Sequence, residues 1–511
     1  MLDPLGYGMT RDASHRVSRS AAALFCIAIV PVLVIVLVRW CFGVPISAFR
    51  PFLSDEISYW HETLTFSTVG FRGGYYTWGE LTNAAGVTPF GPHGPGFPVA
   101  YGMFGRLFGW YRHSPVVLNL AAIACAAWLW TSVSRLSASR TMLAAAVLAT
   151  FWPMMLWAPT GMQEALQHAG AIAMAGFFTQ ALGSAPRRWV NAIGWIALAA
   201  LSFIRPTWLV LMPLWGFATA HAQGRRAIAI SIGWSLLLAI GVLLLYSRTT
   251  APFPTGFFFL RVLDRAEGIS KIWGNLHFNL LRTIEPGEYK FVEVLFRVQY
   301  WLWLAAATTI AIVLRRRRSG AGPVPSTMHL AVGTAAMAAA LALMLILYTL
   351  TNWAEHRVLS AFLLFAVLLC VAVPGKPAML LVSALLASNL ATAKPFVDSF
   401  SAERSDNFVW DRRGSYELAD AIDGRIVYRP DATRWCNTLL TSQYPPHLIV
   451  VPAGFGLSIV REPNEMKLPP RSHFLLLDEA ARADFSGPIH VQPLVTLAYG
   501  TLYVNLDSGC R

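Results

Sequence analysis

Long uncharged apolar segments recur along this chain, and several approach the 20 residues that a helix needs to cross a membrane. Of the 511 residues, 55% are hydrophobic and only 13% are charged, whereas a soluble protein would carry about twice that charged fraction. The sequence therefore predicts a mainly α-helical, polytopic membrane protein with about eleven transmembrane helices. We expect these helices near residues 21–42, 114–133, 141–158, 165–183, 189–204, 206–220, 227–246, 299–314, 328–350, 358–373 and 377–393.

Basic residues gather in every second linker between the predicted spans. By the positive-inside rule these linkers are cytoplasmic, so the amino terminus is cytoplasmic while the other linkers and the tail are extracytoplasmic. The dispersed arginines also account for the net charge of +13 and give no reason to expect a nucleic-acid partner. The cytoplasmic set comprises Arg11, Arg16, Arg19, Arg135, Arg140, Arg187, Arg188, Arg225, Arg226, Arg315 to Arg318, and Lys376.

The first outer loop, residues 43–113, contains one ambiguous segment. Residues 93–111 are apolar, but they are rich in glycine and interrupted by Pro95, Pro98 and Arg106. Counting them as a span would invert every later loop and place the arginine clusters outside. We therefore expect a helix that lies along the outer membrane surface.

The tail from residue 394 differs in character from the preceding chain, because charged residues become frequent and short β-like runs appear. We divide the chain into a transmembrane module, residues 1–393, and a small extracytoplasmic α/β domain, residues 394–511, which is long enough to hold its own core. The expected strands are Gly424–Tyr428, His447–Pro452 and His473–Asp478, and the expected helices are Ser415–Ile422 and Asp478–Asp484. Cys436 and Cys510 both lie in this domain, where an extracytoplasmic location permits a disulfide.

Polar residues collect on the predicted outer face, beginning with the carboxylate pair Asp55 and Glu56 just beyond the first span. Ionised groups close to a bilayer are costly and tend to mark function. Because adjacent side chains point in different directions, the two acids need not share one pocket. The other polar residues expected on this face are His93, Glu164, Arg205, Glu355, His356 and Arg357.

The order of these features resembles the GT-C superfamily of polyprenyl-phosphate-dependent glycosyltransferases, including the aminoarabinose transferases and protein O-mannosyltransferases. The resemblance rests on four short motifs and covers about 390 residues in layout. Two departures concern the subfamily: Gly94 stands where a proline is usual, and no proline follows Arg357. The motifs are the acidic pair in Phe52–Trp60, His93-Gly-Pro-Gly-Phe-Pro98, Phe203-Ile-Arg-Pro206, and Glu355-His-Arg357.

This resemblance implies an enzyme of the bacterial plasma membrane that transfers a sugar from a polyprenyl-phosphate donor to a glycan, lipid or protein hydroxyl. It assigns the general base to Asp55, with Glu56 helping to position substrate. Arg205, Arg357 and His356 are the expected partners of the donor phosphate. The residues expected to position substrate are His93, Tyr59, Trp60, Glu164 and Glu355.

Several alternatives stay open. Asp55 and Glu164 each suit the first turn of a helix, and Tyr59 and Trp60 suit a membrane-interface belt. A lipid-linked saccharide ligase or polymerase would explain the basic loop 247–298, which can attract anionic lipids. A saccharide transporter is less favoured, because the span interiors are nearly free of charge. A divalent cation at Asp55 or Glu56 is also open, although the sequence contains no convincing metal-ligand spacing.

Overall fold

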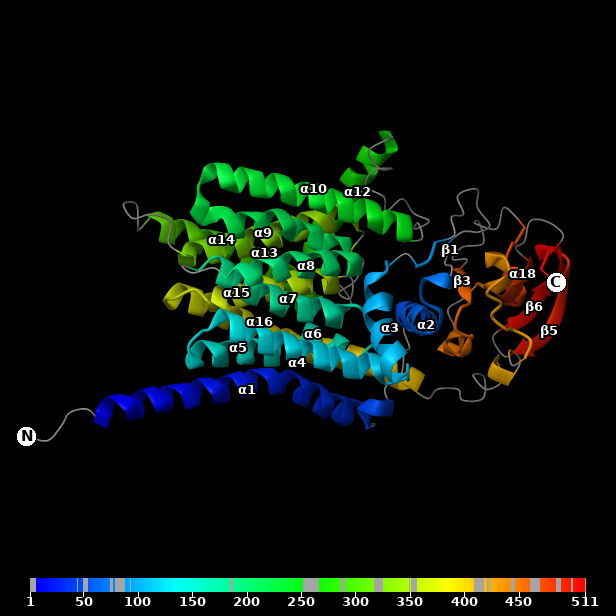
Figure 1. Cartoon of the computed structure of the whole chain (residues 1–511), viewed down its shortest axis with the longest axis horizontal. Coiled ribbons are helices and arrows are strands. Elements are labelled where there is room, and N and C mark those ends of the chain that lie inside the picture. Colours follow the sequence, from blue (N-terminus) through cyan, green and yellow to red (C-terminus); the bar gives the residue numbers. More distant parts are fainter. Residues whose placement is uncertain are drawn as a thin grey trace, which may run out of the picture.

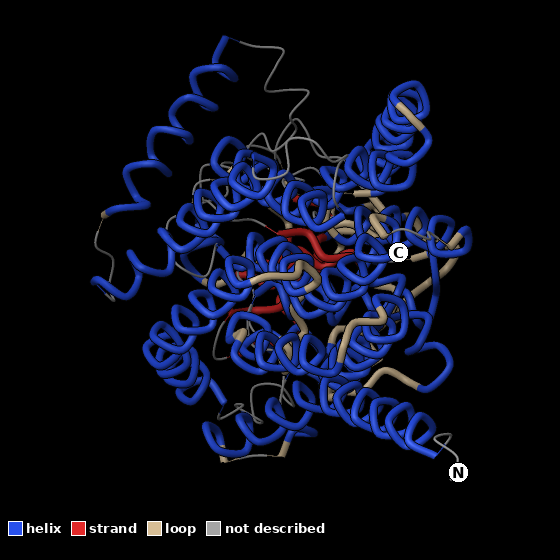
Figure 2. The backbone as a smooth tube through the Cα atoms, turned by 90° about the vertical axis from the view of Figure 1, so that its left-hand side faces the viewer, coloured by secondary structure: helices blue, strands red, loops and turns tan. Residues whose placement is uncertain are grey.

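The structure is a computed structural model of the whole chain. It describes residues 6–43, 45–48, 54–73, 77–78, 88–91, 93–183, 187–250, 266–285, 290–316, 325–348, 350, 356–408, 418–420, 422, 424–442, 446–459, 469–483, 489–497 and 500–510. A bundle of long helices forms one end of the molecule and a small sheet forms the other (Figure 1). Viewed along the bundle, the strands lie behind its centre (Figure 2).

The bundle contains helices of very different lengths. Their bounds are α1 (Gly6–Phe42), α4 (Ser114–Ser134), α5 (Ala138–Thr150), α6 (Trp152–Trp157), α7 (Glu164–Ala181), α8 (Arg188–Ile204), α9 (Leu211–Ala220), α10 (Arg225–Thr249), α13 (Lys290–Arg316), α14 (Pro325–Leu347), α15 (Arg357–Val371) and α16 (Lys376–Phe408). The amphipathic helix α12 (Ala266–Ile284) contacts α13 and α14.

Six helices of the described residues are long and apolar enough to cross a membrane, so the chain is a multi-pass membrane protein, but the expected eleven spans are not confirmed. The six are the predicted first, second, seventh, eighth, ninth and eleventh spans. The other predicted segments form shorter or less apolar helices. For example, the segment 141–158 is divided into α5 and α6, because Pro153 has no backbone N–H to continue the helical ladder.

Two helices, α2 (Ser54–Val69) and α3 (Gly96–Phe108), lie across the end of the bundle, between the long helices and the sheet (Figure 1). Part of the segment 93–111 thus forms a helix, Gly96–Phe108, whereas its expected place along the outer membrane surface stays a prediction. Helix α2 contributes to two cores. Tyr59 packs with the bundle, whereas Ile57 and Trp60 pack with Leu418 and Phe455 of the carboxyl-terminal domain.

Among the described residues, the sheet has six strands in the order β1–β3–β2–β4–β6–β5. The first four run parallel, and β6 and β5 complete the sheet with antiparallel pairing. Its edge strand β1 comes from the segment 43–113, which follows the first span, rather than from the tail. The bounds are β1 (Thr77–Trp78), β2 (Thr438–Thr441), β3 (Gly456–Ile459), β4 (Phe474–Leu477), β5 (Val491–Leu497) and β6 (Gly500–Asn505).

The tail agrees only partly with its prediction. Strand β4 and helix α18 (Glu479–Ala483) lie where the sequence predicted them. The expected strand at His447–Pro452 is wrong, because Pro446–Val450 is a 3-10 helix, and residues 424–428 form no strand. The proposed boundary at residue 393 falls inside α16. The structure joins Cys436 to Cys510 in a disulfide, with the two Cα atoms 5.5 Å apart.

Candidate active site

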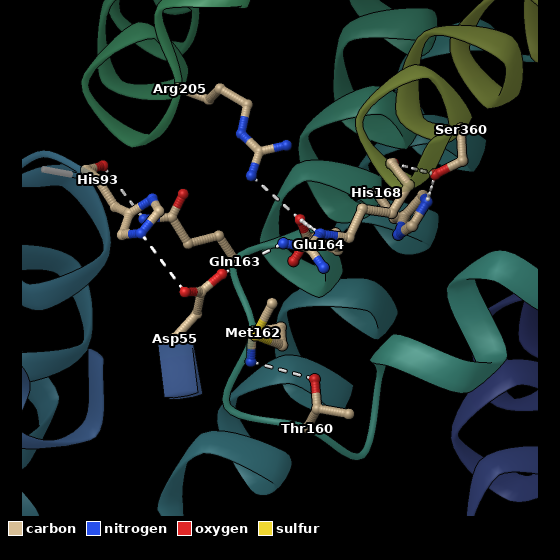
Figure 3. Close-up of polar contacts among 10 residues, drawn as sticks. Asp55, His93, Thr160, Met162, Gln163, Glu164, His168, Arg205 and Ser360 are labelled. Atoms are coloured by element: carbon tan, nitrogen blue, oxygen red, sulfur yellow. Dashed lines mark hydrogen bonds and ion pairs between the residues drawn. The ribbon is translucent and has the colours of Figure 1, made fainter. Parts of the chain in front are cut away.

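Five of the polar side chains expected on the outer face come together at the end of the bundle that faces the sheet. Asp55 lies in the first turn of α2, and His93 lies in the turn before α3. Glu164 begins α7, Arg205 follows the last residue of α8, and Arg357 begins α15. Figure 3 shows Asp55 and His93 on one side of the site, with Glu164 and Arg205 opposite.

Arg357 joins the two carboxylates of the site. Its Nη2 lies 3.2 Å from Asp55 Oδ2, and its Nε lies 3.0 Å from Glu164 Oε1. Arg205 Nη2 donates to the same Glu164 oxygen at 3.1 Å, and His93 Nε2 lies 3.7 Å from Asp55 Oδ1. The result is a continuous chain of alternating charge, Asp55–Arg357–Glu164–Arg205, in which each charged group has an opposite neighbour, and His93 contacts its Asp55 end.

Exposure differs along this chain of charges. The Asp55, His93 and Arg357 side chains are 23%, 20% and 19% exposed, whereas Glu164 is only 1% exposed. An incoming ligand can therefore reach Asp55 and Arg357. Glu164 instead lies beneath them and fixes the two guanidinium groups.

Arg357 and Arg205 each have a further feature beyond their ion pairs. The Arg357 guanidinium lies over the ring of Trp157, at 5.5 Å from its centroid, which is an orientation favourable to a cation. Within the described part of the chain, the buried Nη1 of Arg205 has no hydrogen-bond partner. A buried guanidinium N–H without an acceptor is costly, so this atom is suited to an anionic ligand.

A second contact ties the helices that carry Glu164 and Arg357. Nε2 of His168, one turn after Glu164, lies 2.8 Å from Ser360 Oγ, which donates to the carbonyl of Arg357 (Figure 3). The serine proton is used in that bond, so the imidazole is the donor to the hydroxyl. The pair sets the register of α7 against α15.

Not every residue expected at the site lies in this cluster. Glu56 is fully buried and accepts a hydrogen bond from the Gly161 backbone at 2.7 Å, which holds the loop before α7. Tyr59 packs edge-on against His93, at 5.0 Å between ring centroids. Trp60 is buried on the opposite, domain-facing side of α2. Glu355 lies outside the described residues.

His356 is also directed away from the acids. Its side chain is 6% exposed and stacks on Tyr300, with Phe296 at its edge. Its neighbour Arg357 reaches the cluster because consecutive residues at a helix start project about 100° apart. The expected role of His356 at a phosphate has no support in these contacts.

Two basic residues of the expected basic loop, residues 247–298, form ion pairs and hydrogen bonds within that segment. Arg297 is buried, pairs with Glu293, and donates to the carbonyls of Arg282 and Glu285. Arg282 pairs with Glu285 at 3.0 Å. These two arginines therefore stabilise the α12–α13 connection.

The structure is similar along most of its length to two membrane proteins. ArnT from Cupriavidus metallidurans bound to undecaprenyl phosphate has 13% sequence identity, covers 96% of this chain and 98% of its own, and superposes with a TM-score of 0.42. The archaeal oligosaccharyltransferase AglB from Archaeoglobus fulgidus, in complex with an inhibitory peptide and a dolichol-phosphate, has 12% identity, coverage of 98% and 75%, and a TM-score of 0.47. No protein-family model and no curated protein sequence matches this chain.

Sequence reasoning missed several neighbours of the site. Gln163 donates to the His93 carbonyl at 3.2 Å, and Trp157, His168 and Ser360 support Arg357. His168 lies four residues after Glu164, and Ser360 lies three residues after Arg357, so each pair lies on one helix face. This spacing is the sequence signal that indicates His168 and Ser360. Among the described residues, no group of three or more His, Cys, Asp or Glu side chains is arranged to hold a metal ion.

Proposed function

We propose that this chain is an integral membrane glycosyltransferase that moves a sugar from a polyprenyl-phosphate donor to an acceptor hydroxyl on the extracytoplasmic face. The observation that carries the proposal is the convergence of Asp55 and Arg357, both partly exposed, on a buried Glu164–Arg205 pair. A proton acceptor beside two guanidinium groups is what sugar transfer from a lipid phosphate requires. The motifs around Asp55, His93, Arg205 and Arg357 independently resemble the GT-C superfamily.

In this mechanism Asp55 takes the proton from the acceptor hydroxyl. The acceptor oxygen forms a bond to the anomeric carbon, and the bond from that carbon to the phosphate oxygen breaks. The lipid phosphate leaves with the electron pair. It is a stable anion, so it needs cationic stabilisation rather than a strong general acid.

Arg357 links donor binding to the base. In the structure its Nη2 is occupied by Asp55 at 3.2 Å. A donor phosphate that engages this guanidinium weakens the pair with Asp55, and a carboxylate with a weaker cationic partner holds a proton more tightly. The donor thus makes Asp55 a better proton acceptor at the moment when the acceptor must be deprotonated. Glu164 keeps Arg357 in place during this exchange.

The two ends of α15 support the proposed orientation in the membrane. Arg357 is its first residue, whereas the Arg140 guanidinium, one of the basic linker residues, donates to the carbonyls of Val371 and Ala372 at its far end. The helix is 15 residues long, or about 22 Å at 1.5 Å per residue. If the arginine linkers are cytoplasmic, the candidate site opens to the extracytoplasmic side.

The test is sugar transfer by the purified protein in lipid vesicles supplied with polyprenyl-phosphate sugar. Asp55→Asn keeps the size of the side chain but removes the proton acceptor, so transfer should fall by about 10² to 10⁴-fold. Asp398→Asn, at an exposed ion pair with Lys394, is the matched control and should leave transfer unchanged. Near-normal turnover by Asp55→Asn, at equal protein level, would show that the acid has a structural role and that this mechanism is wrong.

A further inference from the structure

Helix α2 carries a second buried acid, Glu62, that the proposed mechanism does not use. Glu62 is only 2% exposed, and the ion pairs of the described residues do not include it. Buried glutamates are rare in proteins unless a cation or a hydrogen-bond network accompanies them. The contacts of this carboxyl group therefore indicate its role.

One oxygen of Glu62 receives hydrogen bonds and the other does not. Ser58 Oγ donates to Oε1 at 3.1 Å, and the backbone N–H of Gly91 bonds to the same carboxyl group. Gly91 lies so close that a methyl group there would be 2.3 Å from Oε1. Within the described part of the chain, the buried Oε2 has no partner.

Gly91 belongs to the turn that presents His93 to the site. The N–H of Gly94 donates to the Gly91 carbonyl at 3.2 Å, so the two glycines close the turn around His93. The imidazole then lies 3.7 Å from Asp55 Oδ1 and meets the edge of Tyr59. Asp55, Tyr59 and Glu62 follow one another at helical spacing, so a single face of α2 contacts this turn at three levels.

We propose that Glu62 is a positioning residue that acts in its neutral, protonated form and fixes the His93 turn against α2. The proposal about charge and contact stands on the structure alone, whereas its effect on sugar transfer rests on the proposed function.

The hydrogen bonds of Glu62 indicate which oxygen holds the proton in the neutral form. Oε1 accepts from Ser58 and faces the Gly91 N–H, so it behaves as the carbonyl oxygen, and the proton belongs on Oε2. Burial disfavours the charged form and outweighs the two hydrogen bonds, which favour it, so the pKa of Glu62 is raised to about 8. A glutamine would reproduce this arrangement, since its amide oxygen replaces Oε1 and its NH₂ group replaces the protonated oxygen.

The protonated, active form of Glu62 should be lost as the pH rises. Because the folded-state pKa is raised, Glu62 is protonated at neutral pH, and its protonated fraction falls about tenfold per pH unit above a pKa of about 8. Among the described residues, the other titratable groups around the turn are His93 itself, Asp55 and Tyr59 on α2, and Tyr246 of α10, whose ring lies against Gly94. Substitution of Glu62 removes only its own transition and leaves theirs.

The experiment compares three variants of the full chain in lipid vesicles. Glu62→Gln should retain transfer at neutral pH and should lose the alkaline decline of the wild type. Glu62→Leu fills the space but cannot hold Gly91, so kcat should fall by up to about 10²-fold, the cost of a misplaced site group, with little change in KM for the donor. Glu164→Gln serves as the contrasting variant. Glu164 must be ionised to pair with two arginines, so replacing its carboxylate with an amide should abolish transfer.

Infrared spectroscopy gives a readout that does not depend on transfer. The carbonyl band of a protonated carboxyl group should be present at pH 7, should decline with a midpoint near the pKa of about 8, and should be absent from Glu62→Gln. A missing band, or an inactive Glu62→Gln beside an active wild type, overturns the positioning proposal. A present band without sugar transfer by the wild type instead overturns the proposed function.

Discussion

Arg357 contacts both carboxylates of the candidate site, and it does so through different nitrogens. Only a guanidinium can make two such contacts at once from one rigid plane, whereas an ammonium is a single point charge. The identity of this residue should therefore matter as much as its charge.

Arg357→Lys should lower kcat/KM for the lipid-linked donor by about 10 to 10²-fold, because one charge-assisted hydrogen bond is worth about 1.5–3 kcal/mol. Folding should survive, since Arg205 still neutralises Glu164 at 3.1 Å. The measurement is the transfer rate as the donor is varied. Arg140→Lys, at the opposite end of α15, is the matched control, and an equal loss there would contradict a specific role for Arg357.

The sequence predicted the five residues of the cluster better than it predicted their neighbours. Asp55, His93, Glu164, Arg205 and Arg357 each stand at the start or end of a segment on one side of the predicted membrane, so alternation of the linkers brings them together. Glu56, Trp60 and His356 lie in segments that border the site, but their side chains contact other groups than expected. The direction of a side chain depends on how each helix packs, which the linear pattern does not contain.

Helix α2 is the element that connects the site to the carboxyl-terminal domain. On one side it carries Asp55 and Tyr59. On the other, His61 Nε2 lies 2.9 Å from the Phe455 carbonyl, and Thr65 accepts from the Gly454 backbone at 3.2 Å. The imidazole is fully buried in this contact, and burial lowers the pKa of His61 to about 4, so it is neutral at physiological pH.

Ile57→Ala should loosen the contact between α2 and the domain. Ile57 is fully buried in the cluster that contains Leu418 and Phe455, and such truncations cost about 2–5 kcal/mol. Limited proteolysis of the carboxyl-terminal domain should accelerate, and sugar transfer should fall because α2 also positions Asp55. Val427→Ala, at an exposed side chain of the same domain, should change neither. Unchanged proteolysis in Ile57→Ala would show that this packing does not hold the domain.

Helices could be predicted from the sequence where one continuous apolar segment is long enough to define them. The helices α1, α4, α10 and α14 match their predicted spans, because twenty apolar residues leave few alternatives. The strands of the sheet were mostly missed. Strands β2, β3 and β4 have four residues each, and β1 has two, so a period-2 pattern can hardly be read from them. The pairing of β1 with β3 joins Thr77 to Ser458, which are 381 positions apart in the chain.

At the scale of the whole molecule, the disulfide closes the carboxyl-terminal domain over a separation of 74 residues. The double variant Cys436→Ser/Cys510→Ser should lose up to about 4 kcal/mol of stability by the chain-entropy estimate. Denaturant unfolding of the domain signal would measure this loss. Cys125→Ser, at a free exposed cysteine, should have no effect. Equal stability of the double variant would mean that the disulfide adds nothing to the fold.

The orientation of the molecule can be tested independently of activity. In a chain whose free cysteines are replaced by alanine, single cysteines at Gln223 and His490 should label from opposite sides of the membrane. The first lies in the turn before α10, and the second lies in the carboxyl-terminal domain, where its side chain is 71% exposed. Labelling of both from the same side would reject the cytoplasmic amino terminus and extracytoplasmic tail.

The sheet of the carboxyl-terminal domain is built from two separate parts of the chain, because strand β1 precedes most of the helical bundle in sequence. Thr77 and Trp78 pair with Ser458 and Ile459, so the residues after α16 do not include every strand of their own sheet. A fragment cut after Phe408 would leave β3 with an unpaired edge, and open edges of this kind invite association with other chains. In evolution or engineering, replacement of this domain would therefore require exchanging the first outer loop as well, since neither piece is a self-contained module.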